Sequence, residues 1–141
     1  MNIITTKNAK ETEQIGSMLS KEIKTGQVIC LQGDLGGGKT TFTKGFAKGL
    51  GIKQNITSPT FVIMKEYVVN TEKIYKLYHL DCYRLKDSKD VAELGLQDII
   101  KDLNNIVLIE WAERIADILP KNCLHIQFDF VDENTRKISI K

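Results

Sequence analysis

Residues 33–40, with the sequence GDLGGGKT, constrain the fold of this chain more than any other segment. They match the pattern G-x-x-x-x-G-K-[ST], which is typical of a phosphate-binding loop between a strand and a helix. The flanking segments fit that context, because the apolar residues 28–31 predict a buried strand and residues 41–50 predict a helix that ends at Gly51. Glycines let backbone N–H groups converge at the helix N-terminus, where the helix dipole favours an anion. The alternative, a glycine-rich turn without a ligand, does not explain the complete motif.

Two side chains of the motif have the chemistry that a nucleotide needs. Lys39 is predicted to reach the β- and γ-phosphates, and the Thr40 hydroxyl is predicted to ligate Mg²⁺. The predicted nucleotide-binding residues of this segment are Gly33, Asp34, Leu35, Gly36, Gly37, Gly38, Lys39, Thr40 and Thr41.

The length and composition indicate one globular domain spanning residues 1–141. The chain has 42% hydrophobic and 27% charged residues, which is ordinary for a folded protein with its own core. Its formal net charge of +2 is close to neutral and does not by itself argue for nucleic-acid binding.

The cysteines favour a reducing compartment. Cys30, Cys82 and Cys123 are odd in number and widely spaced among apolar or aromatic neighbours, so we interpret them as buried thiols. No apolar run approaches the roughly 20 residues that span a bilayer, and residues 1–7 do not have the layout of a signal peptide. A cytoplasmic location is expected.

Hydrophobic patterning divides the rest of the chain into helices and strands. Strands are predicted at residues 2–5, 60–69, 73–81, 105–110, 123–130 and 135–140. Helices are predicted from Asn8 or Thr12 to about residue 24, and at residues 88–94, 96–103 and 111–119. The apolar face of the first helix is expected to comprise Ile15, Met18, Leu19 and Ile23. This order predicts a three-layer α/β domain with a mixed sheet, whose core is parallel and whose two hairpins add antiparallel strands.

Two carboxylates follow predicted strands, where ligands bind in open α/β sheets. Glu110 ends the apolar strand 105–110 and is predicted to be a metal-side acid, the alternative being a surface glutamate that begins a helix. Asp81 ends the strand 73–81 and is predicted to bind metal through water or to orient the attacking water, the alternative being a turn cap. Lys39, Asp81 and Glu110 are therefore the candidate catalytic residues, with Thr40 and Glu110 as metal ligands.

Three further residues are candidates for a switch-like role. His79 lies two residues before Asp81, and a structurally hydrogen-bonded histidine explains it equally well. Arg84 could neutralise phosphate charge or pair with a buried carboxylate. Thr60, in the segment Ser-Pro-Thr-Phe, is placed where nucleotide switches carry a threonine that senses Mg²⁺ and the γ-phosphate.

Four segments together resemble the TsaE (YjeE) family. They are residues 33–41, residues 58–61 (SPTF), residues 79–85 (HLDCYRL) and residues 108–111 (LIEW), in the family's order and across nearly the whole chain. The resemblance implies a bacterial P-loop ATPase needed to form N6-threonylcarbamoyladenosine (t6A) at adenosine 37 of tRNAs. It also implies that the protein acts with the TsaD and TsaB subunits, that its ATP hydrolysis resets that complex, and that tRNA is contacted through the complex.

The same resemblance assigns roles to individual positions. It implies that residues near Thr6, together with Trp111 and Arg114, approach the adenine, that Asp81 is needed for hydrolysis, and that Thr60 belongs to a switch-like loop. The chain departs from the family pattern at Gly37, where alanine is usual, and at Ala112, where proline is frequent. The second departure leaves the start of the helix 111–119 less fixed.

Two other functions are compatible with a phosphate-binding loop. A small-metabolite kinase would need an acceptor pocket and usually an arginine-bearing lid, whereas Arg84, Arg114 and Arg136 are the only arginines. A nucleotide-gated binding module would bind ATP with hydrolysis incidental. A GTPase is not favoured, because the chain lacks the Asn-Lys-x-Asp guanine-binding sequence.

Overall fold

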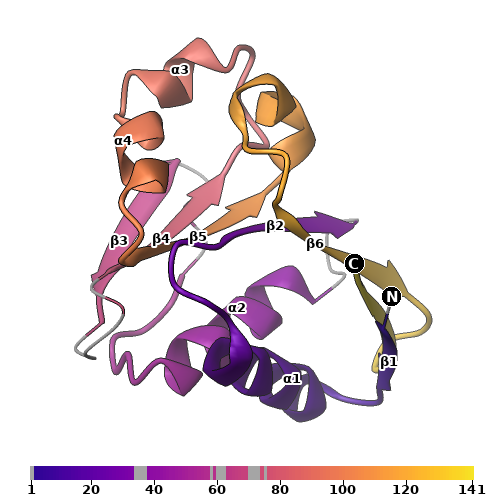
Figure 1. The fold of residues 1–141 in the computed structure, drawn as a ribbon. Coiled ribbons are helices and arrows are strands. Elements are labelled where there is room, and N and C mark those ends of the chain that lie inside the picture. Colours follow the sequence, from indigo (N-terminus) through magenta and orange to yellow (C-terminus); the bar gives the residue numbers. More distant parts are fainter. Residues whose placement is uncertain (1, 34–37, 58, 60–62, 70–73, 75) are drawn as a thin grey trace.

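The chain folds around one seven-stranded sheet (Figure 1). The computed structural model describes residues 2–33, 38–57, 59, 63–69, 74 and 76–141. The strands are β1 (Asn2–Thr6), β2 (Val28–Gly33), β3 (Met64–Val68), β4 (Lys76–Asp81), β5 (Asn105–Glu110), β6 (Leu124–Phe130) and β7 (Arg136–Ile140). The helices are α1 (Ala9–Glu22), α2 (Lys39–Gly49), α3 (Lys89–Ala92), α4 (Leu96–Lys101) and the 3₁₀ helix η1 (Ala112–Ile118).

The sheet is mixed, with a parallel centre and antiparallel edges. Its strand order is β1-β7-β6-β2-β5-β4-β3, and β6, β2, β5 and β4 run parallel to their neighbours within that group. The pairs β1–β7, β6–β7 and β3–β4 are antiparallel. These pairings confirm the predicted edge strand and both hairpins. They also confirm the prediction of a partly parallel sheet.

Helices cover both faces of the sheet, which gives three layers (Figure 1). The central strand β2 is apolar on both faces, so Ile29 and Leu31 enter one core while Val28 and Cys30 enter the other. The first core lies under α1 and α2 and includes Phe42, Phe46 and Phe128. The second lies under α3, α4 and η1 and includes Val91, Leu96 and Ile115. Burial on two faces holds the carboxyl ends of the central strands in fixed positions.

Helix α2 packs closely on α1 because glycines stand at the contact. A Cβ atom at Gly45 would lie 1.9 Å from the Glu13 carbonyl oxygen, and one at Gly16 would lie 2.2 Å from the Phe42 carbonyl oxygen. Both distances are too short for a side chain, and the neighbouring atoms are backbone. The glycines therefore set the separation of the two helices and with it the position of the α2 N-terminus.

Gly45→Ala is expected to lower the free energy of unfolding by about 1–3 kcal/mol, because the added methyl group overpacks this contact. Helix propensity alone acts in the opposite direction, since alanine is favoured over glycine by about 1 kcal/mol within a helix. Urea unfolding of the two proteins decides between these signs. Lys44→Ala, at the exposed neighbouring position, is the matched control and should be nearly neutral. A Gly45→Ala variant as stable as the wild type would contradict the close packing.

The predicted short helix at residues 111–119 is confirmed as the 3₁₀ helix η1 (Ala112–Ile118), which follows a left-handed Trp111 (φ 59°) and contains non-helical angles at Ile115. One prediction about the helices is wrong. Met18 is 60% exposed rather than buried. The α1 positions that are buried are the small residues Thr12, Gly16 and Ser20, which lie four residues apart, and Met18 points away from that stripe.

The cysteines agree with the prediction of buried thiols at two of three positions. Cys30 and Cys82 are fully buried and Cys123 is half-buried, and all three are free. Burial raises the pKa of the Cys30 and Cys82 thiols to about 12. Among the described residues, no helix combines the length and apolar character that crossing a bilayer requires.

Candidate nucleotide-binding site

A cavity of about 390 Å³ lies at the carboxyl ends of the central strands, beside the N-terminus of α2. The sequence-predicted residues that line it are Gly38, Lys39, Thr40, Thr41, Asp81, Arg84, Glu110 and Trp111. The other lining residues among those described are Asn8, Ala9, Thr12, Tyr83, Glu133, Asn134 and Arg136. The fold therefore brings the end of the glycine-rich motif and both predicted carboxylates to one cavity.

The register of the parallel strands brings the two carboxylates together. Asp81 is the β4 residue paired with Glu110 in β5, and Glu110 is in turn paired with Leu31 in β2. The strand of Glu110 thus lies directly beside β2, the strand that begins before the glycine-rich motif. Asp81 and Glu110 are 7% and 5% exposed. Two nearly buried carboxylates at adjacent strand ends are typical of a functional site rather than of a solvated surface.

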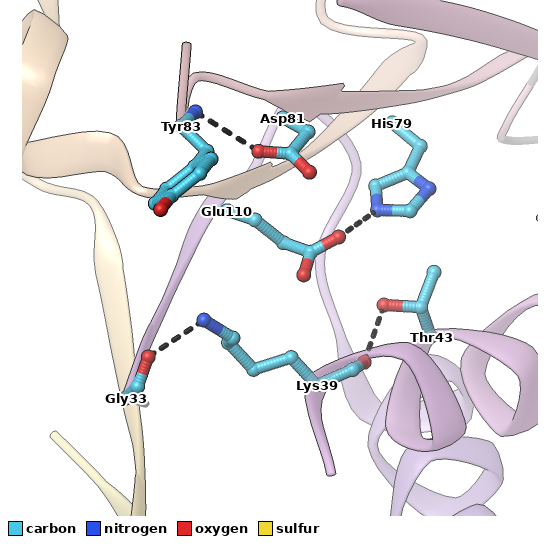
Figure 2. Close-up of polar contacts among 7 residues, drawn as sticks. All are labelled: Gly33, Lys39, Thr43, His79, Asp81, Tyr83 and Glu110. Atoms are coloured by element: carbon cyan, nitrogen blue, oxygen red, sulfur yellow. Dashed lines mark hydrogen bonds and ion pairs between the residues drawn. The ribbon is translucent and has the colours of Figure 1, made fainter. Parts of the chain in front are cut away.

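The carboxylate of Glu110 is held by a histidine (Figure 2). His79 Nε2 lies 2.8 Å from Glu110 Oε2, and the two side chains are 0% and 6% exposed. The sequence left two interpretations of His79 open, and the structure supports a hydrogen-bonded histidine behind the cavity. His79 is not among the residues that line it.

Asp81 combines the two interpretations that the sequence offered. Its Oδ1 accepts a hydrogen bond from the Tyr83 backbone N–H at 2.9 Å, so it caps the turn that follows β4. Its side chain also lines the cavity. Capping fixes the orientation of this carboxylate and leaves it facing the same space as Glu110.

Lys39 is the first residue of α2, and its side chain points toward Gly33 at the end of β2 (Figure 2). Its Nζ donates to the Gly33 carbonyl oxygen at 2.6 Å and lies 4.7 Å from the centroid of the Trp111 ring. Gly33 must be glycine, because its φ is +138° and a Cβ atom would lie 2.3 Å from the Phe128 carbonyl oxygen. An ammonium group is therefore held at the helix N-terminus, inside the cavity.

The start of α2 has the features of an anion-binding helix terminus. Its N-cap, Gly38, is left-handed (φ 99°), and no side chain in the described part of the chain caps the helix. The backbone N–H groups of the first turn, together with the helix dipole, favour a negatively charged group at this end. Thr40 and Thr41 line the cavity from the same turn.

An aromatic wall closes another side of the cavity. The Trp111 and Tyr83 rings lie 4.9 Å apart between centroids, and Arg114 Cζ lies 5.9 Å and 5.7 Å from those two rings. Arg114 donates to the Leu85 carbonyl oxygen and does not line the cavity. Arg114 therefore packs against the two aromatic rings and is not itself part of the cavity surface.

Thr6 does not line the cavity, but it contacts a residue that does. It is 1% exposed, and its hydroxyl is 2.7 Å from the hydroxyl of Thr12, which does line the cavity. Thr6 and Arg114 do not line the cavity themselves, and their predicted approach to the adenine stays a prediction. Asp34, Leu35, Gly36, Gly37 and Thr60 lie outside the described residues.

The sequence interpretation missed two segments of the cavity. Asn8, Ala9 and Thr12 come from the N-cap and the start of α1, Glu133 and Asn134 come from the turn between β6 and β7, and Arg136 is the first residue of β7. Their local signals predicted only a helix cap and a hairpin turn. The antiparallel pairing of β1 with β7 brings them to one place, with Thr6 opposite Arg136.

The mixed, partly parallel sheet with helices on both faces, and the two carboxylates at adjoining strand ends beside the start of α2, define the chain as an α/β protein. The family model described as "Threonylcarbamoyl adenosine biosynthesis protein TsaE" matches residues 6–138. The chain therefore belongs to the TsaE family, which takes part in the biosynthesis of threonylcarbamoyladenosine in tRNA.

Known proteins of this family are similar to the chain along most of its length. The Bacillus subtilis tRNA threonylcarbamoyladenosine biosynthesis protein TsaE is 42% identical over 134 residues, which cover 95% of this chain and 81% of that protein. The Treponema pallidum protein of the same name is 36% identical, over 95% of this chain and 96% of its own. The crystal structure of Bacillus subtilis YdiB superimposes with a TM-score of 0.81 and 37% identity, covering 99% of this chain and 83% of YdiB.

Proposed function

We propose that this protein is a Mg-dependent ATPase that acts in the cytoplasm as a subunit of the t6A-forming machinery, where it supports a TsaD–TsaB transferase complex. The observation that carries the proposal is the meeting of Lys39, Asp81 and Glu110 at one cavity beside the N-terminus of α2. A cation and a helix N-terminus suit a polyphosphate, and two carboxylates suit a metal ion and a water molecule.

The phosphate groups of ATP would lie against the start of α2. The backbone N–H groups of its first turn and the Lys39 ammonium group supply positive potential there. The Gly33 carbonyl oxygen already holds the Lys39 Nζ in one position, so the side chain has little conformational entropy left to lose when a phosphate oxygen replaces that carbonyl as the acceptor.

The residues at the cavity fit Mg²⁺ rather than a metal held entirely by protein. Within the described ranges, no group of three or more His, Cys, Asp or Glu side chains is placed to hold a metal ion. Mg²⁺ needs only one or two carboxylates, because it keeps several waters and binds the substrate's phosphates. Thr40 and Glu110 would hold it, and it would supply charge neutralisation at the phosphates.

The carboxylates have separable roles in this proposal. Glu110 is fixed by His79, which suits a group that must hold one geometry throughout the reaction. Asp81 is paired with Glu110 in the neighbouring strand, and the hydrogen bond from the Tyr83 N–H fixes the orientation of its carboxylate. From that position Asp81 would orient the water that attacks the terminal phosphate.

Measurement of Mg-ATP turnover with and without TsaD and TsaB tests the proposal. We expect slow hydrolysis by the protein alone and an increase of about tenfold or more with both subunits, because a bound partner can complete or order a site. Tyr83, at the cavity, is 40% exposed and available to such a partner. Turnover that both subunits leave unchanged would contradict the role in the complex. ATP-dependent phosphorylation of a metabolite by the protein alone would indicate a kinase instead.

A further inference from the structure

His79 is buried against Glu110 and uses only one of its two ring nitrogens. The residue is 0% exposed, and Nε2 lies 2.8 Å from Glu110 Oε2. Among the residues that the structure describes, Nδ1 has no hydrogen-bond partner. The ring is fully buried, and only one of its nitrogens has a hydrogen-bond partner. These two facts limit which ring nitrogen can carry the proton.

The chemistry of the pair selects one tautomer. An ionised carboxylate only accepts hydrogen bonds, so the short contact requires the proton on Nε2. A second N–H on Nδ1 would be a buried donor without an acceptor, which costs free energy, whereas a bare lone pair there is less costly. His79 therefore donates from Nε2–H to Glu110, while no described residue accepts a hydrogen bond from Nδ1.

We propose that His79 is a positioning residue, which fixes the Glu110 carboxylate through its Nε2–H tautomer and does not itself contact nucleotide. The hydrogen bond restrains one oxygen of Glu110, and Figure 2 shows the other oxygen on the side of Lys39. The carboxylate thus presents one predetermined oxygen to the cavity. This inference rests on the proposed function for its catalytic consequence, although the tautomer itself does not.

The position of His79 in the fold supports positioning over direct sensing of nucleotide. The residue is part of β4 and is paired with Lys65 in β3 and Leu108 in β5, so its backbone is fixed from both sides. Its side chain is closed off from the cavity that Glu110 lines. Because Glu110 is the hydrogen-bond partner of His79 and does line the cavity, any effect of His79 on hydrolysis should pass through that carboxylate.

The tautomer is measured by NMR of protein labelled with ¹⁵N-histidine, without ATP or partners. The chain has two histidines, and the His79 signals are identified by their absence in His79→Gln. We expect a single Nε2–H form of His79, and we expect Glu110→Ala to convert it to an exchanging mixture because the acceptor is gone. An Nδ1–H form, or a mixture in the wild type, would overturn the proposal.

The kinetic test compares two replacements of the same residue in the complex with TsaD and TsaB. The glutamine amide of His79→Gln can donate to Glu110, whereas the leucine of His79→Leu cannot. We expect His79→Leu to lower kcat about 10- to 100-fold with little change in KM for ATP, and His79→Gln to recover most of that loss. His125→Gln is the matched control, because His125 is the other histidine of the chain and does not line the cavity. Equal loss in both His79 variants would overturn the proposal.

A double-mutant cycle separates positioning from a general effect on the fold. If His79 acts only through Glu110, then His79→Leu should cause little further loss of kcat when Glu110 is already glutamine. A full additional loss in that background would overturn the proposal. Absence of ATP hydrolysis by the wild-type complex would instead contradict the proposed function, and the NMR result would still decide the tautomer.

Discussion

Replacing Glu110 with glutamine is expected to lower kcat for partner-stimulated ATP hydrolysis by about 100-fold or more, with a much smaller change in ATP affinity. Glutamine has nearly the same shape as glutamate, and its amide oxygen can still accept the hydrogen bond from His79. The substitution therefore removes charge at the cavity while it preserves the packing. Steady-state turnover and equilibrium binding of ATP, measured on the same preparation, separate the two effects.

Glu113→Gln is the matched control for this variant. Glu113 lies three residues further along the chain, is exposed, and does not line the cavity. Its replacement should leave kcat and ATP affinity close to the wild-type values. A Glu110→Gln protein that retains kcat within about threefold of the wild type would contradict the assignment of Glu110 as a metal-side acid.

The position of Glu110 was predictable because the information that fixes it is local. Residues 106–109 form an uninterrupted apolar run between Asn105 and Glu110, and β5 has the predicted bounds. A strand that is apolar on both faces must be buried between two helical layers, which places it in the parallel centre of the sheet. Its last residue then lies at the ligand-binding edge.

The opposite side of the cavity was not predictable, because it depends on contacts between the two ends of the chain. Asn8 and Asn134 reach the cavity only after β1 pairs with β7 at the edge of the sheet. Nothing in the local sequence of a helix cap or a hairpin turn specifies such a partner. The predicted roles of residues 34–37 and Thr60 lie outside the described residues and stay predictions.

The short helix after Glu110 shows a different limit. The pattern of residues 111–119 predicts helical structure but does not distinguish an α-helix from a 3₁₀ helix. Trp111 adopts left-handed angles that are uncommon for a bulky residue. Its ring packs on Tyr83 and lies beside the Lys39 ammonium group, and these contacts accompany the unusual backbone. The backbone angles of Trp111 are therefore a feature that tertiary packing at the cavity favours and that local helix propensity does not predict.

Lys39→Ala is expected to weaken ATP binding by about 100-fold, because it removes a charge-assisted hydrogen bond to phosphate from a site with little solvent. Lys39 is only 5% exposed, so its charge is poorly screened by water or salt. Its one described hydrogen bond as a donor is to the Gly33 carbonyl oxygen. No ion pair within the described part of the chain includes it, so the variant breaks no salt bridge there.

Thermal unfolding with and without Mg-ATP measures this loss independently of hydrolysis. At a concentration of 100 times the dissociation constant, a ligand stabilises the folded protein by about 2.7 kcal/mol, and a 100-fold weaker site reduces this to about 0.4 kcal/mol. The shift in melting temperature on adding Mg-ATP should therefore nearly vanish in Lys39→Ala. Lys44→Ala, an exposed lysine of the same helix outside the cavity, should keep the full shift. Because the comparison is made between liganded and unliganded forms of each variant, a general loss of stability cannot imitate the result, and a full shift in Lys39→Ala would contradict the phosphate-binding role of the lysine.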